Sequence, residues 1–232
     1  MRHILTALAL IGATLGGPLF AQEGRVVVEL YTSQGCSSCP PADALLDELA
    51  KRNDVIALAL HVDYWDYLGW KDTFSSAAFS ARQNGYARAA NARTVYTPQM
   101  VIGGVDHVVG SKTMQVMDRV AQQRGVESLV GLSVVRNGGS LDIKAEPRRA
   151  GLGDMVVQLV RYQPLETVNI RRGENAGKSI RYVNIVTDWT VIGQWNGESS
   201  MEMNTPATGD APSVVIVQKD GFGPILAAVE LR

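Results

Sequence analysis

Cysteine and histidine are scarce in this 232-residue sequence, which contains two cysteines and three histidines. So few cysteines exclude a small disulfide-rich scaffold, which relies on several bridges in place of a core. Charge is nearly balanced, because 22 lysines and arginines face 23 aspartates and glutamates, and no basic stripe stands out. We therefore expect no nucleic-acid partner, since nothing would counter a phosphate backbone. A hydrophobic content of 46% is enough for a substantial core.

Long apolar runs are missing as well. After residue 21 no stretch approaches the ~20 apolar residues that a membrane span needs. The chain begins with a basic residue at Arg2, an apolar run over residues 4–15, and small residues that end at Ala21. This pattern predicts a signal peptide over residues 1–21 and an exported, periplasmic or secreted protein with no stable membrane insertion after cleavage. An uncleaved anchor is the alternative.

Residues 25–125 alternate between apolar runs of strand length and stretches with helical periodicity. The runs "RVVVELYTS" and "DVIALALHVDY" predict two strands, and Leu45, Leu46 and Leu49 between them recur at helical spacing. Two further helices and a pair of short strands joined by a Gly-Gly turn complete the order β-α-β-α-β-β-α. After residue 125 hairpin signals replace the helical pattern. The sequence therefore predicts an α/β domain followed by an all-β, sandwich-like domain.

Both cysteines, Cys36 and Cys39, lie between the first predicted strand and the first predicted helix, in "YTSQGCSSCPPAD". At a helix N-terminus, unpaired backbone N–H groups and the helix dipole stabilise a thiolate. A thiolate is the nucleophile of disulfide exchange, and Cys39, one turn further on, is placed to resolve a mixed disulfide on Cys36. The position of the pair therefore favours a redox role.

Two other roles for the cysteine pair are weighed against the redox role. As a structural staple, a loop this short contributes only about 2 kcal/mol. As a zinc site, the pair lacks the further cysteines or histidines that complete four ligands. Copper stays open, because Cu(I) needs only two thiolates and one imidazole, and His61 ends the second predicted strand at the same edge of the sheet.

Several segments resemble known families. The strand "VVVELYTS", the Cys36–Cys39 pair and Thr97-Pro98 ahead of "QMVIGG" resemble the thioredoxin superfamily over residues 25–125. More narrowly, "YTSQGCSSCPPAD", "HVDYWDYLGW", "TPQMVIGG" and "RRGENAGKSIRYVNIV" resemble a family of exported bacterial proteins of unknown function with an N-terminal thioredoxin-like domain. The resemblance implies an α/β thioredoxin-like domain over residues 22–125 and a β-rich domain over residues 126–232.

The resemblance also implies roles for individual residues. Cys36 matches the attacking cysteine, Cys39 the resolving one, and Pro98 a cis-proline, while Thr97 would present its backbone to a bound peptide. Glu29, on the first strand, corresponds to a buried acid that relays protons, although a partly solvated edge glutamate is the alternative.

These roles together predict an exported thiol–disulfide oxidoreductase that acts on protein or small thiol substrates. Its only redox group would be the Cys36–Cys39 disulfide, with no other cofactor. The alternative is a binding module of the same fold without turnover: a Cu(I) carrier using Cys36, Cys39 and His61, or a protein-interaction domain. The Ser-Ser dipeptide between the cysteines leaves the redox direction open, so oxidase, reductase and isomerase all remain.

Two further segments need an interpretation. The aromatic residues Tyr64, Trp65, Tyr67 and Trp70 follow the second strand, where open α/β sheets bind ligands. They predict either a substrate platform or cap on the disulfide, or an aromatic core between the two domains. The segment "GENAGKS", residues 173–179, is one residue short of a phosphate-binding loop and precedes no helix, so it predicts a β-turn rather than a nucleotide site.

Overall fold

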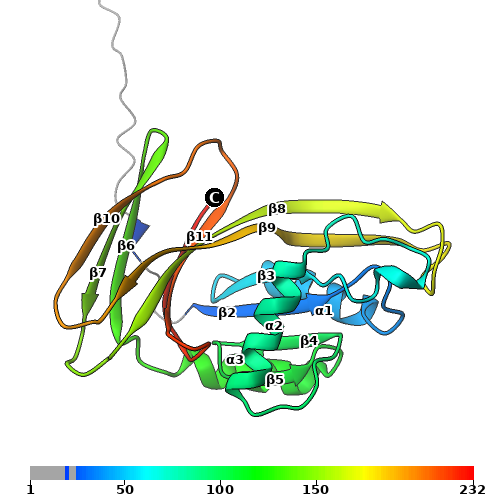
Figure 1. Ribbon diagram of the computed structural model, residues 1–232, viewed down its shortest axis with the longest axis horizontal. Coiled ribbons are helices and arrows are strands. Elements are labelled where there is room, and N and C mark those ends of the chain that lie inside the picture. The colour runs from blue at the N-terminus through cyan, green and yellow to red at the C-terminus, as the bar shows by residue number, and fades with distance from the viewer. Residues whose placement is uncertain (1–18, 21–24) are drawn as a thin grey trace, which may run out of the picture.

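The computed structural model describes residues 19–20 and 25–232, and Figure 1 shows their arrangement. Nearly all of the predicted signal peptide, residues 1–21, lies outside the described residues. The helices are α1 (Pro40–Ala50), α2 (Ala77–Ala89) and α3 (Thr113–Arg124), with one 3-10 turn, η1 (Asp66–Leu68). The strands are β1 (Leu19–Phe20), β2 (Val26–Thr32), β3 (Val55–His61), β4 (Gln99–Ile102), β5 (Asp106–Val109), β6 (Val130–Asn137), β7 (Ser140–Pro147), β8 (Met155–Asn169), β9 (Ser179–Trp195), β10 (Met201–Pro206), β11 (Ser213–Lys219) and β12 (Ile225–Leu231).

An eight-stranded sheet in the order β12-β11-β8-β9-β3-β2-β4-β5 forms the centre of the protein. Every residue of β2 and β3 is buried, which is typical of central strands covered on both faces. These two strands pair in parallel, and their register brings Thr32 beside His61 at their carboxyl ends. The short strands β4 and β5 continue the sheet in antiparallel fashion.

The predicted fold class, an α/β thioredoxin-like domain followed by a separate all-β sandwich, is wrong. The chain is mainly β, and its large sheet does not stop at residue 125, because β9 from the second half pairs with β3 through Ala59 and Ile185. Beyond β9 the sheet runs on through β8, β11 and β12, so both halves of the chain share one sheet (Figure 1). The outer edge of β3 offers unpaired backbone groups that a strand from anywhere in the chain can satisfy. The sequence pattern identified the strands, but it could not identify this partner.

Helices cover both faces of the sheet at its β2–β5 end. On one face α1 and α3 contribute Leu46, Leu49 and Val120 to a core with the inward side chains of β2 and β3. On the other face α2 contributes Phe79 and Tyr86 to a second core. At roughly 1.5–3 kcal/mol for each fully buried large apolar side chain, these two layers hold the helices against the sheet.

A second sheet, with strand order β1-β6-β7-β10, packs on the β8, β11 and β12 end of the large sheet (Figure 1). Side chains of β6 and β7, such as Leu132 and Ile143, meet Val157 of β8 and Val215 of β11 in a separate core. The remaining length of β8 and β9 extends as a long hairpin toward the helical end. The tip of this hairpin, residues 170–178, reaches the cysteine pair.

Candidate functional site

The two cysteines lie between β2 and α1 and are joined by a disulfide with an S–S distance of 2.12 Å. Cys39 is the N-cap residue of α1, and prolines occupy the first turn, where their missing N–H groups cost nothing. The Thr97-Pro98 bond is cis. Cys36 is 2% exposed and Cys39 0% exposed, so a partner reaches the sulfur atoms only if the cover above them moves.

Two of the aromatic residues that follow β3 contact the cysteine loop. Trp65 packs on Gly35 so closely that a Cβ atom at position 35 would lie 3.2 Å from Trp65 Cβ, which explains the glycine before Cys36. The indole N–H of Trp65 donates a 2.7 Å hydrogen bond to Thr97 Oγ1, beside the cis-proline. Trp65 therefore links the cysteine loop to the Thr97-Pro98 segment.

The other aromatic residues of this segment have different surroundings. Trp70 donates a 2.7 Å hydrogen bond to Gln34 Oε1, on the strand side of the cysteine loop. Tyr64 donates to Gln83 Oε1 of α2 at 3.0 Å, and burial raises its pKa to about 12. Tyr67 is 77% exposed. Trp65 and Trp70 thus flank the cysteine loop, whereas Tyr67 points away from it into solvent.

The tip of the β8–β9 hairpin also contacts the cysteine loop. The Asn175 amide donates hydrogen bonds of 2.9 Å to the main-chain oxygens of both Gln34 and Cys36, and Asn175 is fully buried. The main-chain N–H of Ser37 donates a 3.3 Å hydrogen bond to the Glu174 carboxylate, and the Lys178 amine donates one to Asn175 Oδ1. The turn at "GENAGKS" therefore holds the cysteine loop in place through hydrogen bonds. No local sequence signal indicates this contact.

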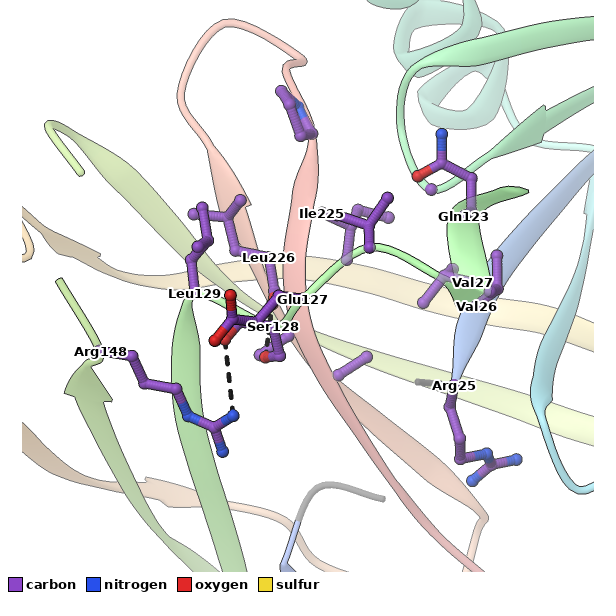
Figure 2. Close-up of a pocket in the computed structure, with 15 residues that line it drawn as sticks. Arg25, Val26, Val27, Gln123, Glu127, Ser128, Leu129, Arg148, Ile225 and Leu226 are labelled. Atoms are coloured by element: carbon purple, nitrogen blue, oxygen red, sulfur yellow. Dashed lines mark hydrogen bonds between the residues drawn. The ribbon is translucent and has the colours of Figure 1, made fainter. Parts of the chain in front are cut away.

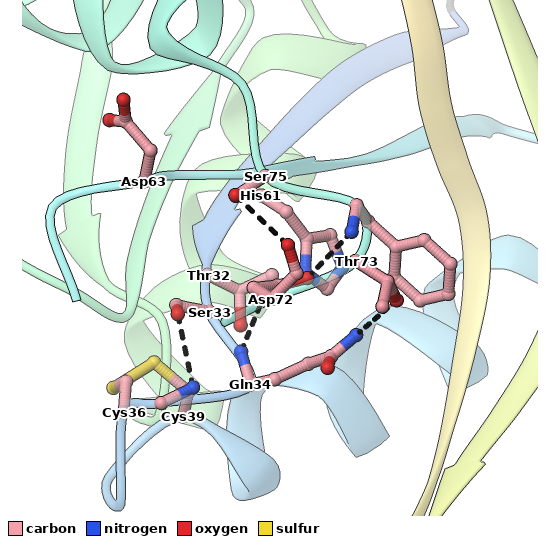
Figure 3. Close-up of polar contacts among 12 residues, drawn as sticks. Thr32, Ser33, Gln34, Cys36, Cys39, His61, Asp63, Asp72, Thr73 and Ser75 are labelled. Atoms are coloured by element: carbon pink, nitrogen blue, oxygen red, sulfur yellow. Dashed lines mark hydrogen bonds and ion pairs between the residues drawn. A yellow bond between two sulfur atoms is a disulfide. The ribbon is translucent and has the colours of Figure 1, made fainter. Parts of the chain in front are cut away.

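A cluster of buried polar side chains lies behind the disulfide, where β2 and β3 end. Thr32 donates to Asp43 Oδ1 at 2.7 Å, and His61 Nδ1 lies 2.7 Å from Asp72 Oδ2. The same Asp72 oxygen accepts a 2.8 Å hydrogen bond from the main-chain N–H of Gln34, which connects the cluster to the cysteine loop (Figure 3). The ring of Tyr182, from β9, stands edge-on to the His61 ring at 4.9 Å.

Three atoms of this cluster, Asp43 Oδ2, His61 Nε2 and the Tyr182 hydroxyl, have no hydrogen-bond partner among the described residues. Each such buried atom costs about 1–3 kcal/mol. Burial raises the pKa of Asp43 from its ordinary 3.8 to about 7, although His61 and the Thr32 hydroxyl act in the opposite direction. Burial, then the charges of Asp43 and Asp72, raise the pKa of Tyr182.

Sequence reasoning did not select Asp43, Asp72 or Tyr182. The available signal for Asp43 is its place in "CSSCPPAD", four residues after Cys39 on the apolar side of a short helix. Asp72 and Tyr182 carry no comparable signal, because their burial depends on the loop after η1 and on β9.

Glu29 belongs to a different network. Its carboxylate accepts hydrogen bonds of 2.7 and 2.9 Å from Arg82, 2.6 Å from Tyr86 and 2.9 Å from Tyr31, all on the α2 side of the sheet. The guanidinium of Arg82 also stacks 3.7 Å from the centre of the Trp189 ring. With its oxygens engaged in this way, Glu29 takes part in an ion pair that joins α2 to the sheet.

In the part of the chain that the structure describes, no group of three or more histidine, cysteine, aspartate or glutamate side chains could hold a metal ion. The structure thus does not assemble the copper set of Cys36, Cys39 and His61. None of the described helices is long and apolar enough to cross a membrane.

A cavity of about 250 Å³ lies elsewhere, between the start of β2, the segment after α3 and β12 (Figure 2). Arg25, Gln123, Glu127 and Leu226 are among its lining residues. None of the residues around the disulfide lines it. This cavity is therefore separate from the disulfide.

The fold recurs in solved structures. The protein AGR_C_4864 from Agrobacterium tumefaciens, known from its X-ray crystal structure, is 35% identical in sequence and superposes with a TM-score of 0.77, over 91% of this chain and 96% of that one. HBP35 of Porphyromonas gingivalis has a TM-score of 0.62 over 89% of this chain and 74% of its own, at 10% identity, and is similar in fold alone.

The chain belongs to the family described as "Protein of unknown function (DUF1223)", whose family model matches residues 27–218. No curated protein matches it. The resemblance to an uncharacterised family is thereby confirmed, and the family brings no assigned activity. The wider likeness to thioredoxins stays a prediction.

Proposed function

We propose that the protein is an exported thiol–disulfide oxidoreductase in which Cys36 attacks and Cys39 resolves. One observation carries the proposal: the two cysteines form a disulfide at the N-terminus of α1, and Trp65, which packs on Gly35 beside them, donates a hydrogen bond to Thr97. A thiolate on Cys36 would be favoured by the helix dipole and by the Ser38 hydroxyl, which lies 3.4 Å from Cys36 Sγ.

The chemistry would be an exchange of disulfides. The Cys36 thiolate attacks a partner disulfide, an S–S bond forms to one partner sulfur, and the other leaves as a thiolate. Cys39 then attacks Cys36 Sγ, forms the Cys36–Cys39 bond and releases the second partner thiolate. Two electrons and two protons pass from the dithiol to the partner, and the reverse sequence oxidises a partner dithiol. Protein or small thiol substrates fit this reaction, and it needs no other cofactor.

Access to the disulfide is the main physical requirement of this proposal, since a buried cysteine is inert. The side chain of Trp65 would move to allow access, because it packs on Gly35 and is held by one side-chain hydrogen bond to Thr97. Its departure would expose the backbone of Thr97 beside Pro98, where an extended partner peptide could bind. Trp65 would then serve as a cap on the disulfide rather than as a fixed platform.

The proposed export rests on the signal-like first 21 residues and agrees with a stable disulfide, which persists in oxidising compartments. It is tested by the mass of the protein recovered from the periplasm or medium. A chain that starts at Gln22 supports export with cleavage, and an intact chain in the cytoplasm contradicts it.

The burial of both sulfur atoms favours a second candidate, a protein-interaction module with a silent disulfide. One experiment separates the two functions. The reduced protein is mixed with oxidised glutathione, quenched with acid at intervals and analysed by mass spectrometry.

For an oxidoreductase we expect a transient mixed disulfide on Cys36, which accumulates in Cys39→Ser and is absent from Cys36→Ser. Glu48→Gln, a change at an exposed position of α1, serves as the control and should react like the wild type. If no variant forms a mixed disulfide and the wild type reacts no faster than a free dithiol, the interaction module is the better account.

A further inference from the structure

The buried polar cluster behind the disulfide is built from five separate segments. Asp43 comes from α1, Thr32 from β2, His61 from β3, Asp72 from the loop after η1, and Tyr182 from β9. All five side chains are buried. Local chain connectivity therefore does not explain why they meet, and none of them is part of the exchange chemistry described above.

Asp43 is the member of the cluster next to the resolving cysteine. Its amide donates a 3.1 Å hydrogen bond to the Cys39 carbonyl, so the two residues lie one helical turn apart on the same face. Helical side chains lean toward the N-terminus of their helix, and the turn that precedes Asp43 in α1 contains Cys39. Oδ1 of this carboxylate accepts from Thr32, whereas Oδ2 has no partner among the described residues.

The two other unpartnered atoms, His61 Nε2 and the Tyr182 hydroxyl, belong to groups that form hydrogen bonds to carboxyl groups. His61 Nε2 can accept or donate a hydrogen bond while Nδ1 contacts Asp72, and the Tyr182 hydroxyl can donate one to a carboxylate. Polar atoms are seldom buried without partners, so a cluster that holds three of them is a candidate functional site.

We propose that Asp43 accepts the proton of the Cys39 thiol during disulfide exchange, and that His61 and Tyr182 stabilise the resulting charge distribution. This inference rests on the proposed oxidoreductase function. In the step, the Cys39 S–H bond breaks and its proton passes to Asp43 Oδ2. The electron pair left on sulfur forms the bond to Cys36 Sγ, and the partner sulfur leaves with the electrons of the mixed disulfide. In the reverse direction Asp43 returns the proton to the Cys39 thiolate.

The surroundings of Asp43 suit it to this task near neutral pH. Burial raises its pKa to about 7, the negative Asp72 adds to the rise, and His61 and the Thr32 hydroxyl oppose it. A base is most effective when its pKa is near the working pH. Glu29, by contrast, is held by Arg82 on the α2 side, so the cluster around Asp43 replaces it as the candidate proton relay.

The test is the pH dependence of resolution, measured as decay of the mixed disulfide with glutathione from about pH 5 to about pH 9. In the wild type we expect the rate to rise with a midpoint of about 7. In Asp43→Asn, which keeps the acceptor for Thr32, resolution at neutral pH should slow by about a hundredfold and rise only as the thiol itself ionises, above about pH 8.5. Asp47→Asn, the same change one turn further along α1, is the matched control and should keep the wild-type profile.

The outcomes separate the two proposals. A wild type that forms no mixed disulfide overturns the oxidoreductase and the relay together. A wild type that exchanges disulfides, with Asp43→Asn showing the same profile, overturns the relay alone. If Asp43→Asn does not fold, Thr32→Val takes its place. The Thr32 hydroxyl donates to Asp43 Oδ1 and lowers the pKa of Asp43, so losing this donor should move the midpoint to higher pH, and an unmoved midpoint overturns the relay.

Discussion

Asn175 and Cys36 are 139 positions apart in the sequence, yet the Asn175 amide donates a 2.9 Å hydrogen bond to the Cys36 carbonyl. The same amide group reaches Gln34, so one side chain from the β8–β9 hairpin fixes both ends of the short turn before the disulfide. The cysteine site is therefore built from both halves of the chain. A fragment that ends near residue 125 would lack this support.

Replacing Asn175 with alanine should loosen the cysteine loop. Two buried carbonyl oxygens lose their donor, which costs about 1–3 kcal/mol of the free energy of unfolding. We also expect dithiothreitol to reduce the disulfide about tenfold faster, measured by thiol release at fixed pH. Lys178→Ala, which removes only the amine on Asn175 Oδ1, is the control and should have a smaller effect. Equal reduction rates in wild type and Asn175→Ala would show that the hairpin does not restrain the loop.

The hydrogen bond between Trp65 and Thr97 should limit access to the disulfide. Trp65→Phe keeps an aromatic ring on Gly35 but removes the donor, and Thr97→Val removes the acceptor at nearly constant volume. Either change should speed reduction of the disulfide several-fold, which corresponds to an activation barrier lower by about 0.5–1.5 kcal/mol. The double variant should be no faster than the quicker single one, because both remove the same bond. Fully additive effects in this cycle would contradict the capping role of Trp65.

The buried ion pair of Glu29 and Arg82 should support the fold and leave the chemistry unchanged. Arg82→Met strands the Glu29 carboxylate in the core, and breaking a buried pair in this way costs about 3–5 kcal/mol of the free energy of unfolding. Urea unfolding measures the loss. Asp54→Asn breaks a partly exposed pair with Arg52 and should cost less than about 1 kcal/mol.

The same experiment checks the role of Glu29. Glu29→Gln should destabilise the protein but keep the pH profile of disulfide exchange under conditions where it is folded. A shifted profile would return Glu29 to the proton relay, in place of Asp43.

Local sequence patterns identified much of the secondary structure around the site. The buried runs at β2 and β3, the helix with Leu46 and Leu49, and the place of Cys36 between strand and helix all follow from the order of apolar side chains over a few residues. Such patterns extend over one element at a time. They therefore say which segments are strands, but not which strands are neighbours.

The parts that sequence reasoning missed all depend on distant neighbours. The pairing of β3 with β9 contradicts the predicted fold class, and it also brings Tyr182 to His61. Asp43 looks like an ordinary polar residue of a first helical turn until β9 and the loop after η1 bury it. The acid on the first strand, Glu29, was selected by family resemblance, whereas its ion pair with Arg82 depends on how α2 packs.

The pH dependence of stability gives an independent check on Asp43. Its pKa in the folded protein is about 7, above the ordinary 3.8 that applies to the unfolded chain, so between these values the folded state binds more protons. The contribution of this group is therefore fully present below about pH 4 and is lost as pH rises through about 7, by up to about 4 kcal/mol. We expect this loss in urea unfolding of the oxidised wild type and its absence in Asp43→Asn, so that the variant gains relative stability from acid to neutral pH. Asp47→Asn should follow the wild-type curve much more closely than Asp43→Asn does, because the Asp47 carboxylate is partly exposed to solvent. Parallel curves for wild type and Asp43→Asn would mean that the Asp43 carboxyl ionises as freely in the folded protein as in the unfolded chain.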